Sequence, residues 1–283
     1  FFTIILLPIS LLMLLIIKIK KILIKSKIFN IPIICVGNIY VGGTGKTPLS
    51  IYIAKELREI GFKSAIVKKF YDQHKDEHDL IKNYFDNLIL HKDRQKAINI
   101  AIKNNFNLVI LDDGFQDYKI KKNLNIICFN NPQLVGNGFI IPAGPLRESL
   151  DSLINAQIVI INGEKNINFE KKLILHNNSL KIFYSEYKPL NIEKFKNSKL
   201  LAFAGIGSPE NFFKLLQDNK LNVAKKIKFP DHYKFDDKHI SQIKLDAKKN
   251  NYKIVTTEKD YLRIKEFDSS GIEFVKVELV IHQ

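Results

Sequence analysis

The side chains that could do chemistry begin in a glycine-rich segment, Val41-Gly42-Gly43-Thr44-Gly45-Lys46-Thr47. An apolar run over residues 31–36 precedes it and predicts a buried strand. Between a strand and a helix, such glycines let backbone N–H groups approach phosphate oxygens, while Lys46 reaches the β- and γ-phosphates and Thr47 binds Mg²⁺. Tyr40 stands where the strict pattern has glycine. We therefore interpret the segment as a variant P-loop; the alternative is a glycine-rich turn that only resembles one.

Two aspartates form a second candidate site. The apolar run 107–111 predicts a strand, and Asp112 and Asp113 follow directly at its carboxyl end. Ligands of open α/β sheets bind at that edge, and an aspartate downstream of a P-loop can hold Mg²⁺ directly or through water. The alternative is an ordinary turn after a strand, and the upstream P-loop favours the metal site.

Two loops present single polar side chains. Arg147 lies in a segment rich in proline and glycine, residues 136–148, which predicts a rigid loop carrying a cation. His232 lies in Phe-Pro-Asp-His-Tyr, residues 229–233, and could be a proton shuttle or a charge partner. A loop arginine or histidine by itself is more often solvated or structural, so neither position predicts a function alone.

Short apolar runs alternate with helical patterns, which indicates an α/β protein with a P-loop NTPase-like parallel sheet. We expect strands at residues 31–36, 64–67, 87–90, 107–111, 124–129, 157–161, 180–184, 199–204, 252–256 and 273–279. We expect helices at residues 48–60, 94–104, 209–218 and 236–248. A polar stretch around Pro189 predicts a domain boundary. The expected division is a membrane-associated helix at 1–28, a P-loop domain at 29–190 and a smaller α/β domain at 191–283.

The amino terminus differs from the rest of the chain. Residues 1–17 are almost entirely apolar, and lysines without any acidic residue follow up to Glu56. As a helix this run would be roughly 26 Å long, close to the roughly 30 Å of a bilayer core. Charge before the run and a cleavage site after it are lacking, so a secretory signal is not indicated. The lysines place the following domain on the cytoplasmic side. A buried core helix is the alternative, and spanning or entering one leaflet both stay open.

Composition sets further bounds. With 283 residues, 46% of them hydrophobic, the chain is expected to fold. The formal net charge of +15 suits an anionic membrane surface, although abundant Lys, Ile and Asn suggest that genomic composition contributes. Nucleic acid is not the expected partner, because the sequence has no zinc pattern, RNA-binding aromatic signature or basic recognition helix. Cys35 and Cys128 lie in apolar runs, which predicts buried, reduced thiols in the cytosol.

Taken together, six motifs resemble those of one family. They are Gly-Gly-Thr-Gly-Lys-Thr-Pro (42–48), Leu-Asp-Asp-Gly-Phe-Gln (111–116), Pro-Ala-Gly-Pro-Leu-Arg-Glu (142–148), Gly-Ile-Gly-x-Pro (205–209), Phe-Pro-Asp-His (229–232) and Thr-Glu-Lys-Asp (257–260). In this order they resemble the tetraacyldisaccharide 4'-kinases, which phosphorylate the lipid A disaccharide precursor at the inner face of the bacterial inner membrane. The resemblance extends from Phe1 to about Arg263, and the family also carries a membrane-associated helix before its P-loop.

The resemblance implies roles for particular residues. Asp76, in Lys-Asp-Glu-His, matches the family's presumed catalytic base, and Glu77 matches a metal-site glutamate. His232 matches the histidine that the family pairs with the base. Arg147 and Arg94 match basic residues expected near phosphates or substrate.

Departures from the family pattern lie mainly in one loop. Residues 68–71, Lys-Lys-Phe-Tyr, stand where the family has Ser-Arg-Gly-Tyr-Gly, and the loop before Asp76 is shorter. Asp117 replaces a histidine after Phe-Gln. Because of these changes, the resemblance does not determine which substrate contacts this loop makes or whether full activity is retained.

The function implied by the resemblance is transfer of the γ-phosphoryl group of ATP, with Mg²⁺, to the 4'-hydroxyl of the tetraacyldisaccharide 1-phosphate lipid A precursor. The expected location is the cytoplasmic face of the inner membrane, against anionic lipids; the oligomeric state is left open. One alternative is a membrane-recruited P-loop ATPase switch, but Val41 stands where such proteins usually carry a signature lysine. Another is a noncatalytic glycolipid-binding protein.

Overall fold

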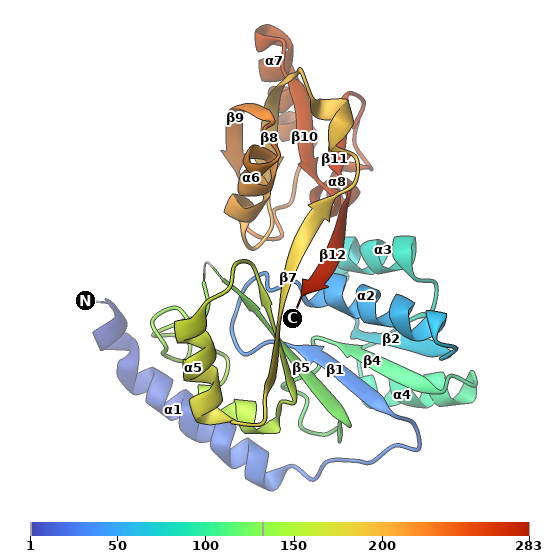
Figure 1. Ribbon diagram of the computed structural model, residues 1–283, viewed down its shortest axis with the longest axis vertical. Helices are drawn as coiled ribbons and strands as arrows, with labels where there is room; N and C mark the ends of the chain where they lie inside the picture. Colours follow the sequence, from blue (N-terminus) through green and yellow to red (C-terminus); the bar gives the residue numbers. More distant parts are fainter. Residues whose placement is uncertain (1, 132, 283) are drawn as a thin grey trace. The chain divides into compact units, whose positions relative to one another are not determined.

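The computed structural model describes residues 2–131 and 133–282, so that Phe1, Pro132 and Gln283 lie outside the described residues. The chain forms two compact units, shown as a ribbon in Figure 1. The first unit comprises Phe1–Phe70, Phe85–Glu186 and Ile281–Gln283, and the second comprises Tyr71–Tyr84 and Tyr187–Val280.

This division differs from the three consecutive segments expected from the sequence. Residues 71–84 were expected in the P-loop domain, but they belong to the second unit. The reason is packing: the segment forms helix α3 (Lys75–Tyr84), which packs against helix α8 (Glu258–Ile264). The boundary expected at residue 190 lies close to the observed one at residue 187.

The first unit is built on one large sheet, two of whose strands continue into residues assigned to the second unit. Its strands are β1 (Ile33–Gly37), β2 (Ser64–Lys69), β3 (Leu88–His91), β4 (Leu108–Asp112), β5 (Leu124–Asn130), β6 (Ile158–Asn162), β7 (Lys181–Pro189) and β12 (Val277–His282). Their order is β12-β7-β6-β5-β1-β4-β2-β3. Strands β1 to β7 pair in parallel, which confirms the predicted parallel α/β sheet.

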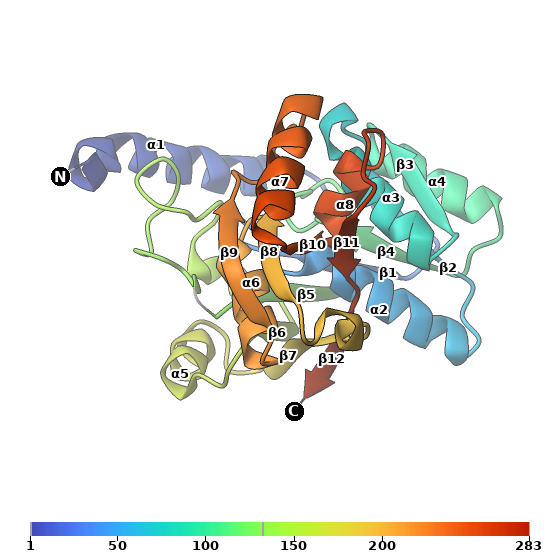
Figure 2. The ribbon, with the colours of Figure 1, turned by 90° about the horizontal axis from the view of Figure 1, so that it is seen from above.

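Helices cover both faces of this sheet (Figures 1 and 2). Helix α2 (Lys46–Glu59) lies against β1, β2 and β4 on one face. Helices α4 (Arg94–Lys103) and α5 (Ile167–His176) pack on the other face, where Ala97, Ile98 and Phe169 join one hydrophobic core. Short 3₁₀ helices occupy Asp72–His74, Leu150–Asn155 and Ile192–Phe195.

Helix α1 (Phe2–Leu23) is attached to the first unit along one side. Met13, Leu14 and Ile17 pack against the hydrophobic core. The buried Ser10 hydroxyl donates to the Ile140 carbonyl at 2.8 Å and accepts the N–H of Ala143 at 2.9 Å. The Lys21 ammonium pairs with the Glu148 carboxylate. These contacts fix the middle and the carboxyl-terminal part of α1, from Ser10 to Lys21, against the domain.

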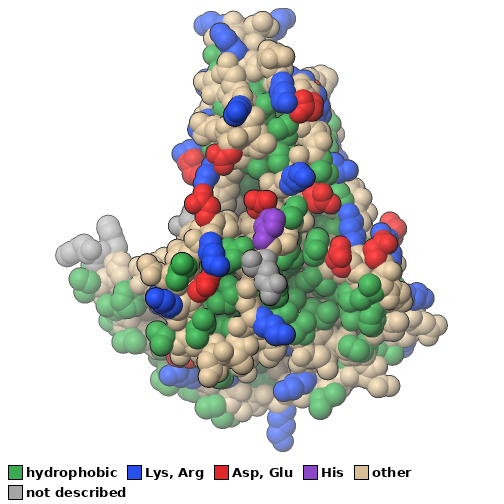
Figure 3. All heavy atoms as spheres, in the orientation of Figure 1, with side chains coloured by type: hydrophobic (Ala, Val, Ile, Leu, Met, Phe, Trp, Pro, Cys, Tyr) green, Lys and Arg blue, Asp and Glu red, His purple; other side chains and the backbone are tan. Residues whose placement is uncertain are grey.

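The remaining sides of α1 are apolar and exposed. The exposed large side chains of this helix are Ile4, Ile5, Ile9, Leu11, Leu12, Leu15, Ile16, Ile19, Ile22 and Leu23. Figure 3 shows hydrophobic side chains gathered where α1 lies in Figure 1. Thr3–Leu23 has a mean hydropathy of 2.3, and by length and composition it could cross a membrane. The helix therefore combines a docked side with an open apolar side.

The second unit has its own parallel sheet. It contains β8 (Lys199–Ala204), β9 (Asn222–Lys228), β10 (Lys253–Thr257) and β11 (Ile272–Val275), in the order β11-β10-β8-β9. Helix α6 (Pro209–Asp218) packs on one face through Phe212 and Phe213. Helix α7 (Asp237–Asn250) packs on the other through Ile240 and Ile243 (Figure 2).

Some elements differ from the sequence-based expectation. Helices α3 and α5 and strand β9 were not predicted. The strand expected at 273–279 is two strands, because β11 pairs with β10 whereas β12 joins the sheet beside β7. By contrast, β8 and α6 have the expected bounds. The predicted thiols are confirmed as free and buried.

We predict that both thiols resist alkylation in the folded protein. Burial raises the pKa of Cys35 and of Cys128 to about 12, so that both stay protonated at pH 8 and lack the reactive thiolate. Iodoacetamide at pH 8 should modify neither residue in the native protein and both in 6 M guanidinium, as counted by mass spectrometry. Rapid modification of either residue in the native protein would contradict the packing described for β1 and β5.

Candidate active site

The glycine-rich segment forms the turn between β1 and α2. Gly42 has a φ of 137° and Gly45 a φ of 81°, values that side-chain-bearing residues rarely adopt. Gly45 is the N-cap of α2 and has no side chain that could accept the first N–H groups of the helix. These backbone N–H groups therefore point outward from the helix end. Together with the helix dipole, they suit the anion site that the sequence predicts.

Side chains around the turn hold its shape. The Asn38 amide donates to the Thr44 hydroxyl at 3.3 Å, and the Asn130 amide donates to the Gly43 carbonyl at 3.3 Å. Tyr40 replaces the expected glycine without entering the phosphate cradle. Its ring is fully buried, and its hydroxyl accepts the Asn130 N–H at 2.7 Å. The departure from the strict pattern is therefore a packing residue that ties the turn to β5.

Asp112 is the centre of a buried polar cluster at the carboxyl ends of the strands. The Thr47 hydroxyl donates to Asp112 Oδ2 at 2.9 Å, and the Ser50 hydroxyl donates to Oδ1 at 3.2 Å. The Lys68 ammonium lies 2.5 Å from Oδ2. Thr47 and Ser50 come from α2, one turn apart, whereas Lys68 is the last residue but one of β2. The structure thus brings the predicted Thr47 and Asp112 together and adds Ser50 and Lys68, which sequence reasoning missed.

Asp113 faces three cationic side chains. Lys46 Nζ lies 3.8 Å and Arg147 Nη1 lies 3.3 Å from Asp113 Oδ1. Arg94 Nη2 donates to the Asp113 carbonyl at 2.6 Å. Burial acts to raise the pKa of the Asp113 carboxyl, but the charges of Lys46 and Arg147 outweigh it and hold this pKa below its usual value. The predicted residues Lys46, Arg147, Arg94 and Asp113 therefore form one charged cluster beside the P-loop.

This donor set suits Mg²⁺. Hydroxyl and carboxylate oxygens are its preferred protein ligands, and it usually keeps waters and phosphate oxygens as the remaining ones. Within residues 2–131 and 133–282, no group of three or more His, Cys, Asp or Glu side chains could hold a metal ion. Thr47, Asp112 and Asp113 would therefore hold Mg²⁺ together with nucleotide phosphates rather than as a closed cage.

The predicted catalytic residues of the second unit also cluster. Asp76 is buried at the start of α3, and the Arg263 Nε–H donates to its Oδ2 at 2.8 Å. His232 Nδ1 lies 3.9 Å from the same oxygen. Lys259 Nζ donates to Glu77 Oε1 at 2.9 Å, and His232 Nε2 lies 3.7 Å from that oxygen. Asp76 and His232, which the resemblance pairs, thus lie close to each other within one unit.

Arg263 connects this cluster and was not singled out from the sequence. Besides Asp76, its guanidinium donates from Nη1 to the Gly205 carbonyl at 2.5 Å and to Asp260 Oδ1 at 2.8 Å. One side chain thereby joins α3, the turn after β8 and α8. Its position three residues after Asp260 on one helix was the available signal, because side chains at that spacing lie on one helix face.

The surroundings of His232 favour its neutral form. Burial, followed by the charge of Lys259, lowers its pKa, and the nearby carboxylates only partly oppose this. Arg263 Nη2 lies 3.4 Å from His232 Nδ1, so we assign Nδ1 as the acceptor and place the proton on Nε2, towards Glu77. The His74 ring stacks on the His232 ring with 4.6 Å between centroids. The imidazole is therefore held in one orientation.

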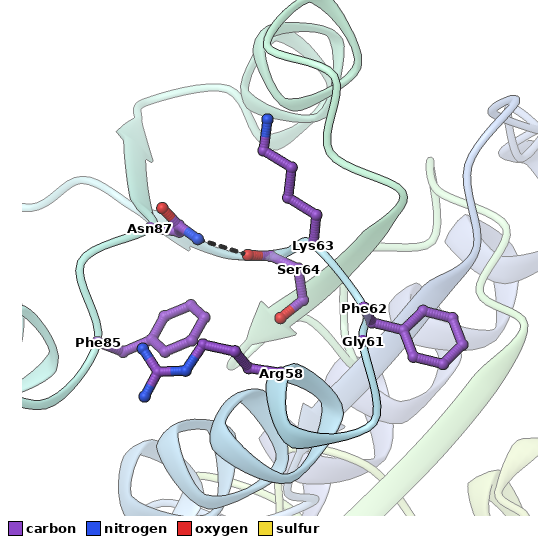
Figure 4. A pocket seen from close by; sticks show the side chains of 7 residues that line it. All are labelled: Arg58, Gly61, Phe62, Lys63, Ser64, Phe85 and Asn87. Atoms are coloured by element: carbon purple, nitrogen blue, oxygen red, sulfur yellow. Dashed lines mark hydrogen bonds between the residues drawn. The ribbon is translucent and has the colours of Figure 1, made fainter.

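A hollow of about 290 Å³ in the first unit lies elsewhere (Figure 4). Arg58, Phe62 and Phe85 line it, and Figure 4 shows the Asn87 amide bonded to the Ser64 carbonyl beside them. Ser64 begins β2, whereas Lys68 and the phosphate cradle lie at the carboxyl ends of the strands. Since open parallel sheets bind ligands at that carboxyl edge, we do not assign this hollow to the nucleotide.

The chain is similar to proteins of one known family. A sequence profile of the family described as tetraacyldisaccharide-1-P 4'-kinase matches residues 2–283. A tetraacyldisaccharide 4'-kinase of Pelagibacter ubique is 42% identical over 289 residues, covering 99% of this chain and 90% of that protein. The protein of that name from Rickettsia bellii is 34% identical, covering 89% of this chain and 82% of its own length.

The fold matches a solved structure as well. The crystal structure of LpxK from Aquifex aeolicus in complex with ATP superposes with a TM-score of 0.75 and 22% identity, covering 100% of this chain and 96% of that one. At this identity the match concerns the fold, and it confirms the α/β architecture. The profile match over nearly the whole chain and the close relatives establish the resemblance carried by the six motifs: the chain belongs to the tetraacyldisaccharide 4'-kinase family.

Proposed function

We propose that this protein transfers the γ-phosphoryl group of ATP to the 4'-hydroxyl of the tetraacyldisaccharide 1-phosphate precursor of lipid A. The observation that supports this most is the buried cluster in which Thr47, from the P-loop, donates to Asp112 at the end of β4. This pairing of a P-loop hydroxyl with a strand-end aspartate is the arrangement that phosphoryl-transfer enzymes use around Mg²⁺. Membership of the family supplies the acceptor.

Lys46, Arg147 and Arg94 provide the positive charge for the transferring group. They already lie around Asp113, at distances of 2.6 to 3.8 Å. When bound, Mg²⁺ neutralises charge on the phosphate oxygens. Fixed cations stabilise the charge that develops on the transferring group without reorganising, which is the main source of catalysis in this chemistry. Thr47 and Asp112 orient the site, and the backbone N–H groups of the P-loop bind the phosphates.

Asp76 is the proposed base that takes the proton of the acceptor hydroxyl. Arg263 holds the carboxylate at Oδ2, and the neutral His232 ring lies beside it. His232 and Arg263 thus orient Asp76, and Glu77 is proposed as a further metal-site partner, although its contacts are with Lys259 and the histidines. A nucleotide-dependent switch would have no use for this acid–imidazole cluster, which favours acceptor chemistry.

We further propose that α1 lies in the membrane surface rather than crossing it. One side of the helix is occupied by the domain through Ser10, Met13 and Lys21. The opposite side is apolar and suits the boundary between headgroups and acyl chains. The exposed lysines Lys18, Lys20, Lys25 and Lys27 would bind anionic lipids of the cytoplasmic leaflet. The acceptor, itself a phosphorylated amphiphile, would be reached from that leaflet.

The direct test is transfer of ³²P from [γ-³²P]ATP to the purified tetraacyldisaccharide 1-phosphate in mixed micelles. Labelled lipid that requires both Mg²⁺ and the acceptor supports the proposal. Release of inorganic phosphate at a rate independent of acceptor would instead indicate an ATPase switch. Binding of the lipid without consumption of ATP would indicate a noncatalytic glycolipid-binding protein.

Lys46→Ala should nearly abolish transfer while the protein stays folded. Removing one charge partner of the transferring phosphate costs about 3–4 kcal/mol of transition-state stabilisation, so kcat should fall by about 10²–10³-fold. Initial rates at saturating ATP measure this. Lys63→Ala is the control. Lys63 directly precedes β2, at the end of the strand away from the phosphate cradle, and it donates to the Asn104 carbonyl. Near-normal turnover in folded Lys46→Ala protein would disprove the proposed role of the P-loop.

Asp76 and His232 should act as one unit. Each single alanine variant should lower kcat by roughly 10²–10⁴-fold, and the double variant should be little worse than the poorer single one, because residues serving one proton transfer are not additive. Asp79→Ala is the matched control, since Asp79 lies on the same helix and pairs with Lys265 at 3.2 Å. Multiplicative losses would indicate independent roles, and full activity of Asp76→Ala would place the base elsewhere.

The exposed side of α1 should drive membrane binding. Leu12 and Leu15 are 57% and 54% exposed, so the double Gln variant removes apolar surface without touching the docked side. Its partitioning onto anionic vesicles should fall by about ten- to a hundredfold, while ATP binding should not change. Sedimentation with vesicles measures this, and the control is Leu175→Gln, which changes a still more exposed leucine (86%) on α5. If Leu175→Gln lowered vesicle binding as much as the double variant, the exposed side of α1 would not be the membrane-binding surface.

A further inference from the structure

The last residue but one of β2 is a buried lysine. The side chain of Lys68 is 6% exposed, and its ammonium lies 2.5 Å from Oδ2 of the fully buried Asp112. The two residues are register partners on neighbouring parallel strands, so their side chains leave the same face of the sheet, towards α2. Burying an ammonium is costly unless it is paired, so this position indicates a specific use of the charge.

Lys68 competes for the carboxylate that the phosphate site needs. Asp112 Oδ2 accepts both the Thr47 hydroxyl and the Lys68 ammonium, while Oδ1 accepts the Ser50 hydroxyl. A fixed positive charge at this distance neutralises the carboxylate. It also repels any divalent cation that approaches the same oxygen, and this repulsion is strong because the site is shielded from water.

We propose that Lys68 is a positioning residue that holds Asp112 towards Thr47 and keeps a divalent cation from binding this carboxylate before nucleotide is present. The phosphates of the nucleotide supply the extra negative charge that makes the ion favourable there. The metal therefore enters together with ATP rather than ahead of it. This inference rests on the proposed function, because that function places ATP and Mg²⁺ at the P-loop.

The test is Mn²⁺ binding to the whole protein without nucleotide, followed through the electron paramagnetic resonance signal of free Mn²⁺, which replaces Mg²⁺ at such oxygen sites. The variant is Lys68→Gln, whose amide can still donate to Asp112 but carries no charge. The wild type should bind Mn²⁺ weakly, and Lys68→Gln should bind it at least about tenfold more tightly. Lys69→Gln, the next residue on the strand, is the matched control and should behave as the wild type.

A gain of affinity cannot arise from mere loss of structure. The tighter site should disappear in Lys68→Gln/Asp112→Asn, which removes its carboxylate. Equal Mn²⁺ affinities of wild type and Lys68→Gln would overturn the proposal, as would submillimolar binding to the wild type alone. If Lys68→Gln does not fold, the Mn²⁺ titrations of the wild type and of Lys68→Met still test the proposal, because Met also removes the positive charge. Binding of ATP to the wild type in the presence of Mg²⁺, measured by equilibrium dialysis, tests the proposed function separately. If ATP did not bind, the proposed function would be wrong, whereas the comparison of Mn²⁺ affinities would still stand.

Discussion

A buried negative charge at the carboxyl end of β4 is the constraint on which the first unit depends. Burying an unpaired carboxylate costs several kcal/mol, and Asp112 is fully buried. Its compensating donors come from α2, through Thr47 and Ser50, and from β2, through Lys68. A slip of one residue in the pairing of β2 with β4 would turn Lys68 to the other face and leave the charge unpaired. The contacts that shape the phosphate site thus also specify the strand register.

The second unit uses a comparable arrangement around an arginine. The planar guanidinium of Arg263 donates in several fixed directions at once, which a lysine in its place could not do. It thereby joins Asp76 on α3 to the Gly205 carbonyl and to Asp260 on its own helix. Asp76 is held where α3 packs on α8, so the position of the proposed base depends on a contact between segments far apart in the sequence. This explains why a shortened loop before Asp76 is compatible with an ordered carboxylate.

Local patterns predicted the parallel sheet and the residues around the P-loop, because strand, turn and helix signals lie next to one another there. Lys46, Thr47, Asp112 and Asp113 all follow from such signals, and their mutual contacts follow from parallel pairing. The sequence could not place α3, since Lys75–Tyr84 is largely polar and docks only through tertiary packing. It also missed β9, an edge strand in which mostly exposed lysines obscure the alternation. The burial of Lys68 depends on strand register, which no local pattern gives.

Helix α1 shows why an apolar run can leave two interpretations open. A core helix and a membrane helix are both apolar, and the sequence does not indicate which side of the helix faces the protein core and which faces lipid. In the structure Ser10, Met13 and Ile17 face the domain, whereas Leu12 and Leu15 are exposed. A helix crossing a bilayer alone would meet lipid on every side, but here one side is already occupied. Because the helix is attached from Ser10 to Lys21, insertion of the open side would hold the whole first unit at a fixed depth. The phosphate site would then lie at a set distance from the lipid surface that supplies the proposed acceptor.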